Sequence, residues 1–226
     1  MPISENLRRV RGGIEQACAR AGRDPSGVRL VAVSKLADCS QILAAAEAGQ
    51  ADFGENYLQK ALPKIESCSG KGLRWHMIGR LQSNKAARVA SAFDLVHSLD
   101  SRKVARALSK GSIAGGSTCE VLIQVKLGGG DARGGVPPEG VYDFAAEIST
   151  LPALGLRGVM GVAPLGEPAR PSFARLRRAF EDLRAQPPPG ARIEVLSAGM
   201  SQDFGDAILE GATMVRIGTA IFGRRR

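Results

Sequence analysis

The chain has 226 residues, of which 44% are apolar and 23% are charged, and both fractions are typical of globular proteins. Its 28 glycines and 12 prolines are too few for a low-complexity sequence. A chain of this length can bury a large core without disulfides or a structural metal. Collagen, disorder and coiled coil are excluded, and we expect one domain over residues 1–226.

The net charge of +9 would suit an anionic ligand, a nucleic acid or an acidic surface. Aromatic residues make up only 4% of the chain, so the stacking platforms of single-strand binders are missing. The basic residues are spread over helical faces except for Arg224, Arg225 and Arg226. We therefore expect no nucleic-acid partner.

The four cysteines lie far apart without a C-x-x-C pair, and only His76 and His97 could join them as metal ligands, so no metal site is predicted. The first residues lack an apolar signal region, and no apolar run is long enough to span a membrane. We expect a cytoplasmic location, reduced thiols and no membrane contact.

Eight short apolar or β-branched runs alternate with stretches of helical periodicity. The predicted strands are residues 29–34, 52–54, 74–78, 95–98, 120–125, 155–159, 193–196 and 213–217. The predicted helices are residues 4–21, 40–48, 57–66, 83–91, 101–108, 138–150, 171–185 and 202–210. This alternation favours a (β/α)₈ TIM barrel with an extra N-terminal helix, and a doubly wound sheet is the alternative.

Several helices carry start or stop signals. Ser40 precedes an apolar run and is a predicted start, while Gly22, Gly49 and Gly211 stand just past predicted ends. The Pro/Gly-rich stretches 128–138 and 187–190 are predicted to be loops between strands and helices.

Lys35 is the first candidate site residue. Alternation places Val31, Val33 and Lys35 on one side of the first strand, with Lys35 at the C-terminal end, where barrels carry their active sites. An amine there is expected to be partly desolvated, which lowers its pKa and prepares it to attack a carbonyl. A solvated loop lysine is the alternative.

Two glycine-containing loops follow the last two predicted strands. One contains Gly199, Met200 and Ser201, and the other contains Gly218 and Thr219. Loops after strands 7 and 8 of such barrels often hold a phosphate, because backbone N–H groups can approach the anion. Ordinary glycine turns are the alternative for either loop alone.

Arg216 alternates with Val215 and Ile217, so it points into the barrel if those two residues pack outward. A buried guanidinium needs a ligand or a distant acid. A lysine, a phosphate site and an inward arginine together suggest pyridoxal 5′-phosphate, whose aldehyde, phosphate and ring nitrogen need three such groups.

The chain also resembles the pyridoxal phosphate homeostasis proteins, which are single-domain barrels related to the N-terminal domain of alanine racemase. The resemblance covers nearly the whole chain. Its main carriers are Val31-Ala32-Val33-Ser34-Lys35, Asp52-Phe53-Gly54-Glu55-Asn56-Tyr57, Trp75-His76-Met77-Ile78-Gly79, Gly199-Met200-Ser201-Gln202-Asp203 and Val215-Arg216-Ile217-Gly218-Thr219.

The resemblance implies a role for each candidate residue. Lys35 would form the internal aldimine, Ser201, Gly218 and Thr219 would hold the phosphate, and Arg216 would face the pyridine nitrogen. Asn56 and Met200 would line the pocket, with a helix N-cap as the alternative role of Asn56. His76 lies on a strand whose end would border the pocket, with a satisfied core histidine as the alternative.

The resemblance has departures. The family often has a second lysine and a proline soon after the first lysine, but here the run is Leu36-Ala37-Asp38. Arg80 stands where histidine is usual, and Ala198 where methionine or leucine is common. Residues 128–135 replace a usual Lys-Ser-Gly with an arginine-glycine version.

The implied function is to store or deliver pyridoxal phosphate and so maintain vitamin B6 and amino-acid and keto-acid homeostasis. A monomer without strong turnover is expected, with apo pyridoxal-phosphate-dependent enzymes as partners. A racemase of the alanine racemase type is the alternative, but two-base racemisation needs a second acid or base, and the only tyrosines are Tyr57 and Tyr142. Arg216 would also keep the ring nitrogen unprotonated and weaken the coenzyme as an electron sink.

Overall fold

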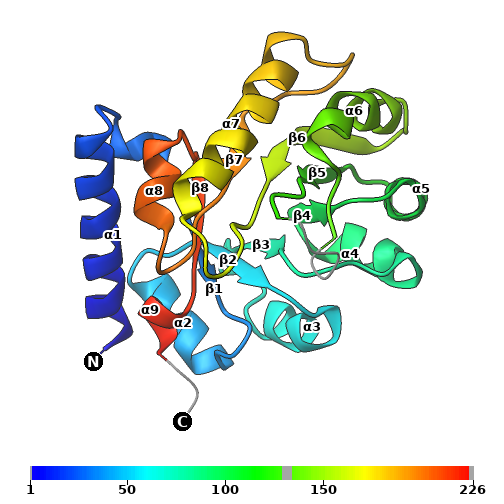
Figure 1. The fold of residues 1–226 in the computed structure, drawn as a ribbon. Helices are drawn as coiled ribbons and strands as arrows, with labels where there is room; N and C mark the ends of the chain where they lie inside the picture. The colour runs from blue at the N-terminus through cyan, green and yellow to red at the C-terminus, as the bar shows by residue number, and fades with distance from the viewer. Residues whose placement is uncertain (1, 129–133, 224–226) are drawn as a thin grey trace.

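Eight parallel strands close into a barrel in the computed structural model, which describes residues 2–128 and 134–223 (Figure 1). The strands are β1 (Arg29–Val33), β2 (Asp52–Glu55), β3 (Arg74–Met77), β4 (Leu95–Leu99), β5 (Cys119–Gln124), β6 (Leu154–Met160), β7 (Val195–Ser197) and β8 (Met214–Ile217). Each strand pairs with the next, and β8 pairs with β1. The (β/α)₈ barrel and all eight predicted strands are confirmed, and the doubly wound alternative is wrong.

The helices surround the barrel, as Figure 1 shows. They are α1 (Ile3–Arg20), α2 (Cys39–Glu47), α3 (Leu58–Ser67), α4 (Ala86–Ala92), α5 (Arg102–Ala114), α6 (Val141–Ser149), α7 (Ala169–Ala185), α8 (Phe204–Leu209) and α9 (Thr219–Phe222). The short α9 is absent from the sequence prediction. In the described part of the chain, no helix is long and apolar enough to cross a bilayer.

The predicted end of the helix over residues 101–108 is wrong, because α5 continues to Ala114. Gly111 lies inside this continuation, against α4. A Cβ on Gly111 would come 2.4 Å from the Cα of Ala87, so the missing side chain lets the two helices approach closely.

The predicted start of α2 at Ser40 is also wrong. The Asp38 carboxylate accepts from the backbone N–H of Gln41, and the Gln41 side chain accepts from the N–H of Asp38. This reciprocal pair is a capping box, and Ser40 only donates its hydroxyl to Asp38. The predicted stop at Gly49 is confirmed, since it follows the helix with a φ of 81°.

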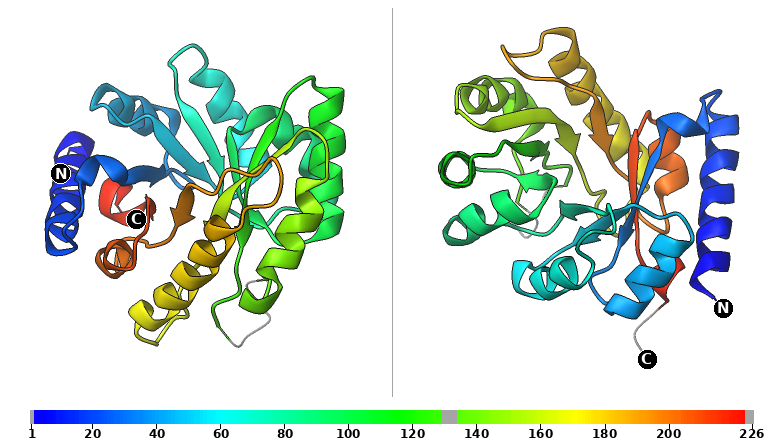
Figure 2. Two further views of the ribbon diagram at one scale, coloured as in Figure 1. Left: turned by 90° about the horizontal axis from the view of Figure 1, so that it is seen from above. Right: turned by 180° about the vertical axis from the view of Figure 1, so that it is seen from behind.

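The extra helix α1 lies outside the barrel beside α8 and α9 (Figures 1 and 2). Asn6 donates to the carbonyl of Ile221 in α9, and Arg11 donates to the carbonyls of Ala48 and Gly49 at the end of α2. Near its C-terminal end, Arg23 donates to the carbonyl of Ile208 in α8. These bonds fix α1 over the place where the barrel closes.

The apolar core has two parts. The larger part fills the space between strands and helices, and the smaller part inside the barrel consists of Val31, Leu95, Leu122, Met160 and Met214. The interior also carries polar side chains, which are described below. The loop 187–190 joins α7 to β7 as predicted, whereas residues 129–133 of the other predicted loop and the arginines 224–226 lie outside the described residues.

Candidate functional site

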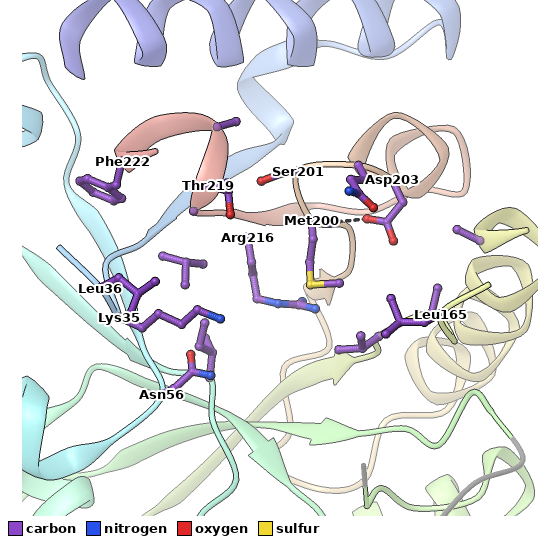
Figure 3. A pocket seen from close by; sticks show the side chains of 18 of the residues that line it. Lys35, Leu36, Asn56, Leu165, Met200, Ser201, Asp203, Arg216, Thr219 and Phe222 are labelled. Atoms are coloured by element: carbon purple, nitrogen blue, oxygen red, sulfur yellow. Dashed lines mark hydrogen bonds between the residues drawn. The ribbon is translucent and has the colours of Figure 1, made fainter. Parts of the chain in front are cut away.

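One cavity of about 900 Å³ opens at the C-terminal ends of the strands. Its lining includes all seven residues that the sequence proposes for coenzyme binding, namely Lys35, Asn56, Met200, Ser201, Arg216, Gly218 and Thr219 (Figure 3). They come from the loops after β1, β2, β7 and β8 and from β8 itself. The topology therefore brings together residues that are far apart in the sequence, and their roles remain predictions.

Lys35 lies two residues beyond the end of β1 and points into the cavity (Figure 3). Val31 faces the barrel interior, as alternation predicts. The expected partial desolvation of Lys35 is not seen, because its side chain is exposed. The cavity is open at this point, so the protein alone does not remove water from the amine.

A buried cluster behind Lys35 was missed by sequence reasoning. The Glu55 carboxylate accepts from the Ser34 hydroxyl at 2.7 Å and from the Lys64 amine at 2.8 Å. Lys64 also donates to the carbonyl of Ser34 at 2.7 Å. The cluster ties α3 to the residue before Lys35. A glutamate in a buried strand was the available signal, because a buried carboxylate needs a partner.

The loop after β7 is shaped by Gly199 and Asp203. Gly199 has a φ of 89°, and a Cβ there would lie 2.7 Å from the Cα of Phe204, so the turn requires glycine. The Asp203 carboxylate accepts from the N–H of Met200 at 2.6 Å. Among the described residues, the N–H groups of Ser201 and Gln202 have no acceptor, which leaves them available to an anion.

The loop after β8 lies beside the loop after β7, because the N–H of Arg216 at the end of β8 donates to the carbonyl of Gly199 at 2.9 Å. The side chains of Thr219 and Ser201 both line the cavity (Figure 3). A Cβ on Gly218 would come 3.0 Å from the carbonyl oxygen of Val33, so glycine allows β1 and this loop to meet. Thr219 begins the short helix α9, and its N–H has no acceptor inside that helix. Two hydroxyl groups and several N–H groups thus converge.

Arg216 points into the cavity, as predicted, since Val215 and Ile217 pack outward. It is 4% exposed and donates to the Ser197 hydroxyl at 2.6 Å and the Gly161 carbonyl at 3.0 Å. Within the described residues it forms no ion pair. Burial lowers the pKa of Arg216 to about 10, so the guanidinium stays charged at neutral pH.

Asn56 and Met200 both line the cavity (Figure 3). The Oδ1 atom of Asn56 is buried and has no hydrogen-bond partner in the described chain. The N-cap alternative for Asn56 is wrong, because Tyr57 is the N-cap of α3 and no side chain caps that helix. An unpartnered amide oxygen in a cavity marks a place for a ligand donor.

His76 does not line the cavity. It is 1% exposed, and its ring bonds to Asp52 at 2.9 Å and to His97 at 3.0 Å. The alternative of a satisfied core histidine is therefore correct. The end of its strand does border the cavity, because Ile78 just after β3 is part of the lining. The pairing with His97 could not be read from the sequence, because it depends on the register between β3 and β4.

Comparisons with known proteins agree with this geometry. Residues 6–226 match the family model "Alanine racemase, N-terminal domain". The pyridoxal phosphate homeostasis protein of Pseudomonas aeruginosa is 43% identical, with 99% of this chain and 96% of the relative covered. The one from Pasteurella multocida is 42% identical, with 100% and 98% covered. PipY of Synechococcus elongatus, whose structure was solved with PLP bound, is 36% identical with a TM-score of 0.85, and the match covers 98% of this chain and 100% of PipY.

The closed barrel and the family match place the chain in the class of barrels built like the N-terminal domain of alanine racemase. Within that class, the identity to curated relatives over almost their full length is decisive. The chain belongs to the pyridoxal phosphate homeostasis protein family.

Proposed function

We propose that this protein binds pyridoxal 5′-phosphate in the cavity at the top of the barrel and stores or delivers it. The observation that carries the proposal is the convergence of an amine, a buried cation and two hydroxyl-bearing loops in one cavity. The relatives bear the name of pyridoxal phosphate homeostasis, and PipY was solved with this coenzyme.

The residues present fit the three polar parts of the coenzyme. Ser201, Gly218 and Thr219 would hold the phosphate through hydroxyl and N–H donors, while Arg216 would face the ring nitrogen. Asn56 and Met200 would contact the ring, and the unpartnered Oδ1 of Asn56 offers an acceptor. When bound, the coenzyme supplies an aldehyde, with which the Lys35 amine would condense with loss of water.

We further propose that the protein carries the coenzyme rather than turning over substrates. Two-base racemisation needs a second acid or base facing the lysine, and neither Tyr57 nor Tyr142 lines the cavity. Arg216 keeps its charge at neutral pH, so a proton on a ring nitrogen beside it would be disfavoured by repulsion. A ring without that proton withdraws electrons poorly, which disfavours transamination and decarboxylation.

The open mouth of the cavity supports release of the coenzyme. Leu36, Leu165 and Met200 line the cavity and expose apolar surface, with fractional exposures of 58%, 79% and 37%. We propose apo enzymes that depend on pyridoxal phosphate as the acceptors, with the protein acting as a cytoplasmic monomer.

Reduction of the loaded protein with borohydride, followed by peptide mass analysis, tests the proposal. Label is expected on Lys35, and the Lys35→Met variant should take up none. The matched variant Lys103→Met, which changes an exposed lysine of α5, should be labelled like the wild type. Label on a different lysine, or none after coenzyme is supplied, overturns the assignment.

A further inference from the structure

A chain of polar side chains runs through the barrel interior, where such barrels are usually filled by branched apolar residues. Arg216 bonds to Ser197 at 2.6 Å, Ser197 to His97 Nδ1 at 3.0 Å, His97 Nε2 to His76 Nδ1 at 3.0 Å, and His76 Nε2 to Asp52 Oδ1 at 2.9 Å. All five residues are buried. The chain crosses the interior from β8 and β7 to β4, β3 and β2.

The two ends of the chain fix the direction of its hydrogen bonds. A guanidinium only donates, so Ser197 accepts from Arg216 and can give its own proton to His97 Nδ1. A carboxylate only accepts, so Asp52 takes the proton on His76 Nε2. His76 Nδ1 then carries a lone pair and accepts from His97 Nε2. Every polar atom along the path is satisfied with both rings neutral and protonated at Nε2.

Asp52 is suited to end the chain as a carboxylate. Burial raises the pKa of Asp52, but hydrogen bonds from Arg74 and His76 and the nearby positive charge outweigh this effect and hold the pKa well below its usual range. Arg74 binds the carboxylate through two nitrogens at 2.8 and 2.6 Å. The negative charge of Asp52 is therefore already paired before the histidines are considered.

The reverse direction leaves a proton without an acceptor. If His76 carried two protons, it would donate to His97 Nε2, and His97 Nδ1 would donate to Ser197. Ser197 would then receive protons from both His97 and Arg216, and its own hydroxyl would have no acceptor among the described residues. An extra buried charge would also stand between two arginines, because Arg74 already neutralises Asp52.

We propose that Ser197, His97 and His76 are positioning residues that hold Arg216 at the floor of the cavity. Their hydrogen bonds run in one direction from its guanidinium to Asp52. This series of hydrogen-bonded side chains compensates a buried cation that has no ion-pair partner among the described residues. It also fixes the plane of the guanidinium group that Arg216 presents to a ligand. The benefit to coenzyme binding rests on the proposed function, whereas the existence of the hydrogen-bonded series does not depend on that function.

Nitrogen NMR of the two histidine rings tests the chain in the protein without coenzyme. At pH 7, both rings are expected to be neutral with the proton on Nε2 and not on Nδ1. A proton on Nδ1 of either ring, or a doubly protonated ring, overturns the proposal. This result does not depend on whether pyridoxal phosphate binds.

Variants of Ser197 test the effect on the cavity. Ser197→Ala should weaken pyridoxal 5′-phosphate binding about tenfold, which corresponds to 1.4 kcal/mol, and should shift the His97 Nδ1 resonance. Ser197→Thr keeps the hydroxyl and should restore both. Ser112→Ala removes a buried hydroxyl without a partner in α5 and is the matched control, with no change expected.

Unchanged affinity and an unchanged His97 resonance in folded Ser197→Ala overturn the positioning role. If that variant does not fold, the wild-type ring NMR decides the proposal. Failure of the wild type to bind coenzyme would instead remove the proposed function, while the histidine tautomers would still show whether the chain exists.

Discussion

Two cations near the cavity, the partly buried Lys64 and the buried Arg216, are held in different ways. Lys64 is paired with the Glu55 carboxylate, whereas Arg216 is bonded to a hydroxyl and a carbonyl. A cation that is paired with a buried carboxylate is structural, because it compensates the charge of that carboxylate. A cation that is bonded only to neutral acceptors can still interact with a ligand. The contrast distinguishes Lys64, which supports the backbone next to Lys35, from Arg216, which lines the cavity.

Removing Lys64 is expected to destabilise the protein strongly. In Lys64→Met, the Glu55 carboxylate, whose side chain has 0% exposure, loses its cation. The free energy of unfolding should fall by about 3 kcal/mol. Urea denaturation measures it, and the exposed control Lys103→Met should stay within about 0.5 kcal/mol. Equal behaviour of the two variants would show that the Glu55 pair carries no stability.

Removing the hydroxyls of Ser201 and Thr219 is expected to affect phosphate binding selectively. Each charge-assisted hydrogen bond contributes about 1.5 kcal/mol or more. The Ser201→Ala/Thr219→Ala double variant should therefore bind pyridoxal 5′-phosphate at least about a hundredfold more weakly. Titration with pyridoxal, which lacks the phosphate, is the control and should change little. Equal losses for both ligands would place the phosphate elsewhere in the cavity.

Residues that face the cavity were predictable where a simple geometric rule decides. Strand alternation places Arg216 inward, and the end of β1 places Lys35 at the cavity. The support of these residues was not predictable. Glu55 meets Lys64, and His76 meets His97, only after strands and helices that are separate in sequence have packed together. The tertiary structure decides which buried polar groups become partners, and a local sequence pattern does not show this.

At the scale of elements, β6 carries an irregularity that shapes the barrel wall. Val121 pairs with Leu156 and Leu122 with Gly158, so Arg157 is an extra residue and forms a bulge. The bulged Arg157 side chain lies 3.0 Å from the Glu120 carboxylate. Gly158 has a φ of 146°, a conformation that other residues rarely adopt.

Gly158→Ala is expected to be destabilising. Its new Cβ would lie 2.0 Å from the carbonyl oxygen of Val195, so the backbone of β6 or β7 must shift. Strain of this kind should lower the free energy of unfolding by about 2 kcal/mol or more. Gly155→Ala is the control on the same strand, where the nearest atom is 3.6 Å away and little change is expected. Similar urea midpoints for the two variants would contradict the steric argument.

Strands were predicted more accurately than helix ends. Most strands are short apolar or β-branched runs between polar loops, and the predicted bounds differ from the observed ones by at most two residues. The start of α2 depends on whether Asp38 or Ser40 takes the capping role, and both are good caps by type. The length of α5 depends on the contact of Gly111 with α4. A glycine in a helical pattern does not by itself indicate such a contact.

At the scale of the whole molecule, the closed barrel has two distinct regions. Its C-terminal end carries the cavity, while its interior holds both an apolar cluster and the polar chain from Asp52 to Arg216. Because that chain contains groups that titrate differently in the folded and unfolded states, the stability of the whole barrel is coupled to pH.

The coupling has a defined sign. Burial, together with the nearby charge of Arg216, lowers the pKa of His97 well below its ordinary value of 6.5. The unfolded chain therefore binds a proton at His97 below about pH 6.5 while the folded chain does not, and stability is lost as the pH falls. The lowered pKa of Asp52 acts in a separate window, with stability present above about pH 3.9 and lost below it.

Between pH 7 and pH 5, His97 alone should reduce the free energy of unfolding by about 2 kcal/mol, given about 1.36 kcal/mol per pH unit for one proton. Urea denaturation at a series of pH values measures this decline. His97→Gln should be less stable at pH 7, because it breaks the polar chain, but its decline toward pH 5 should be smaller by that amount. If wild type and His97→Gln decline in parallel, His97 gains its proton inside the folded barrel without cost, and the neutral imidazole inferred from its burial and partners is wrong.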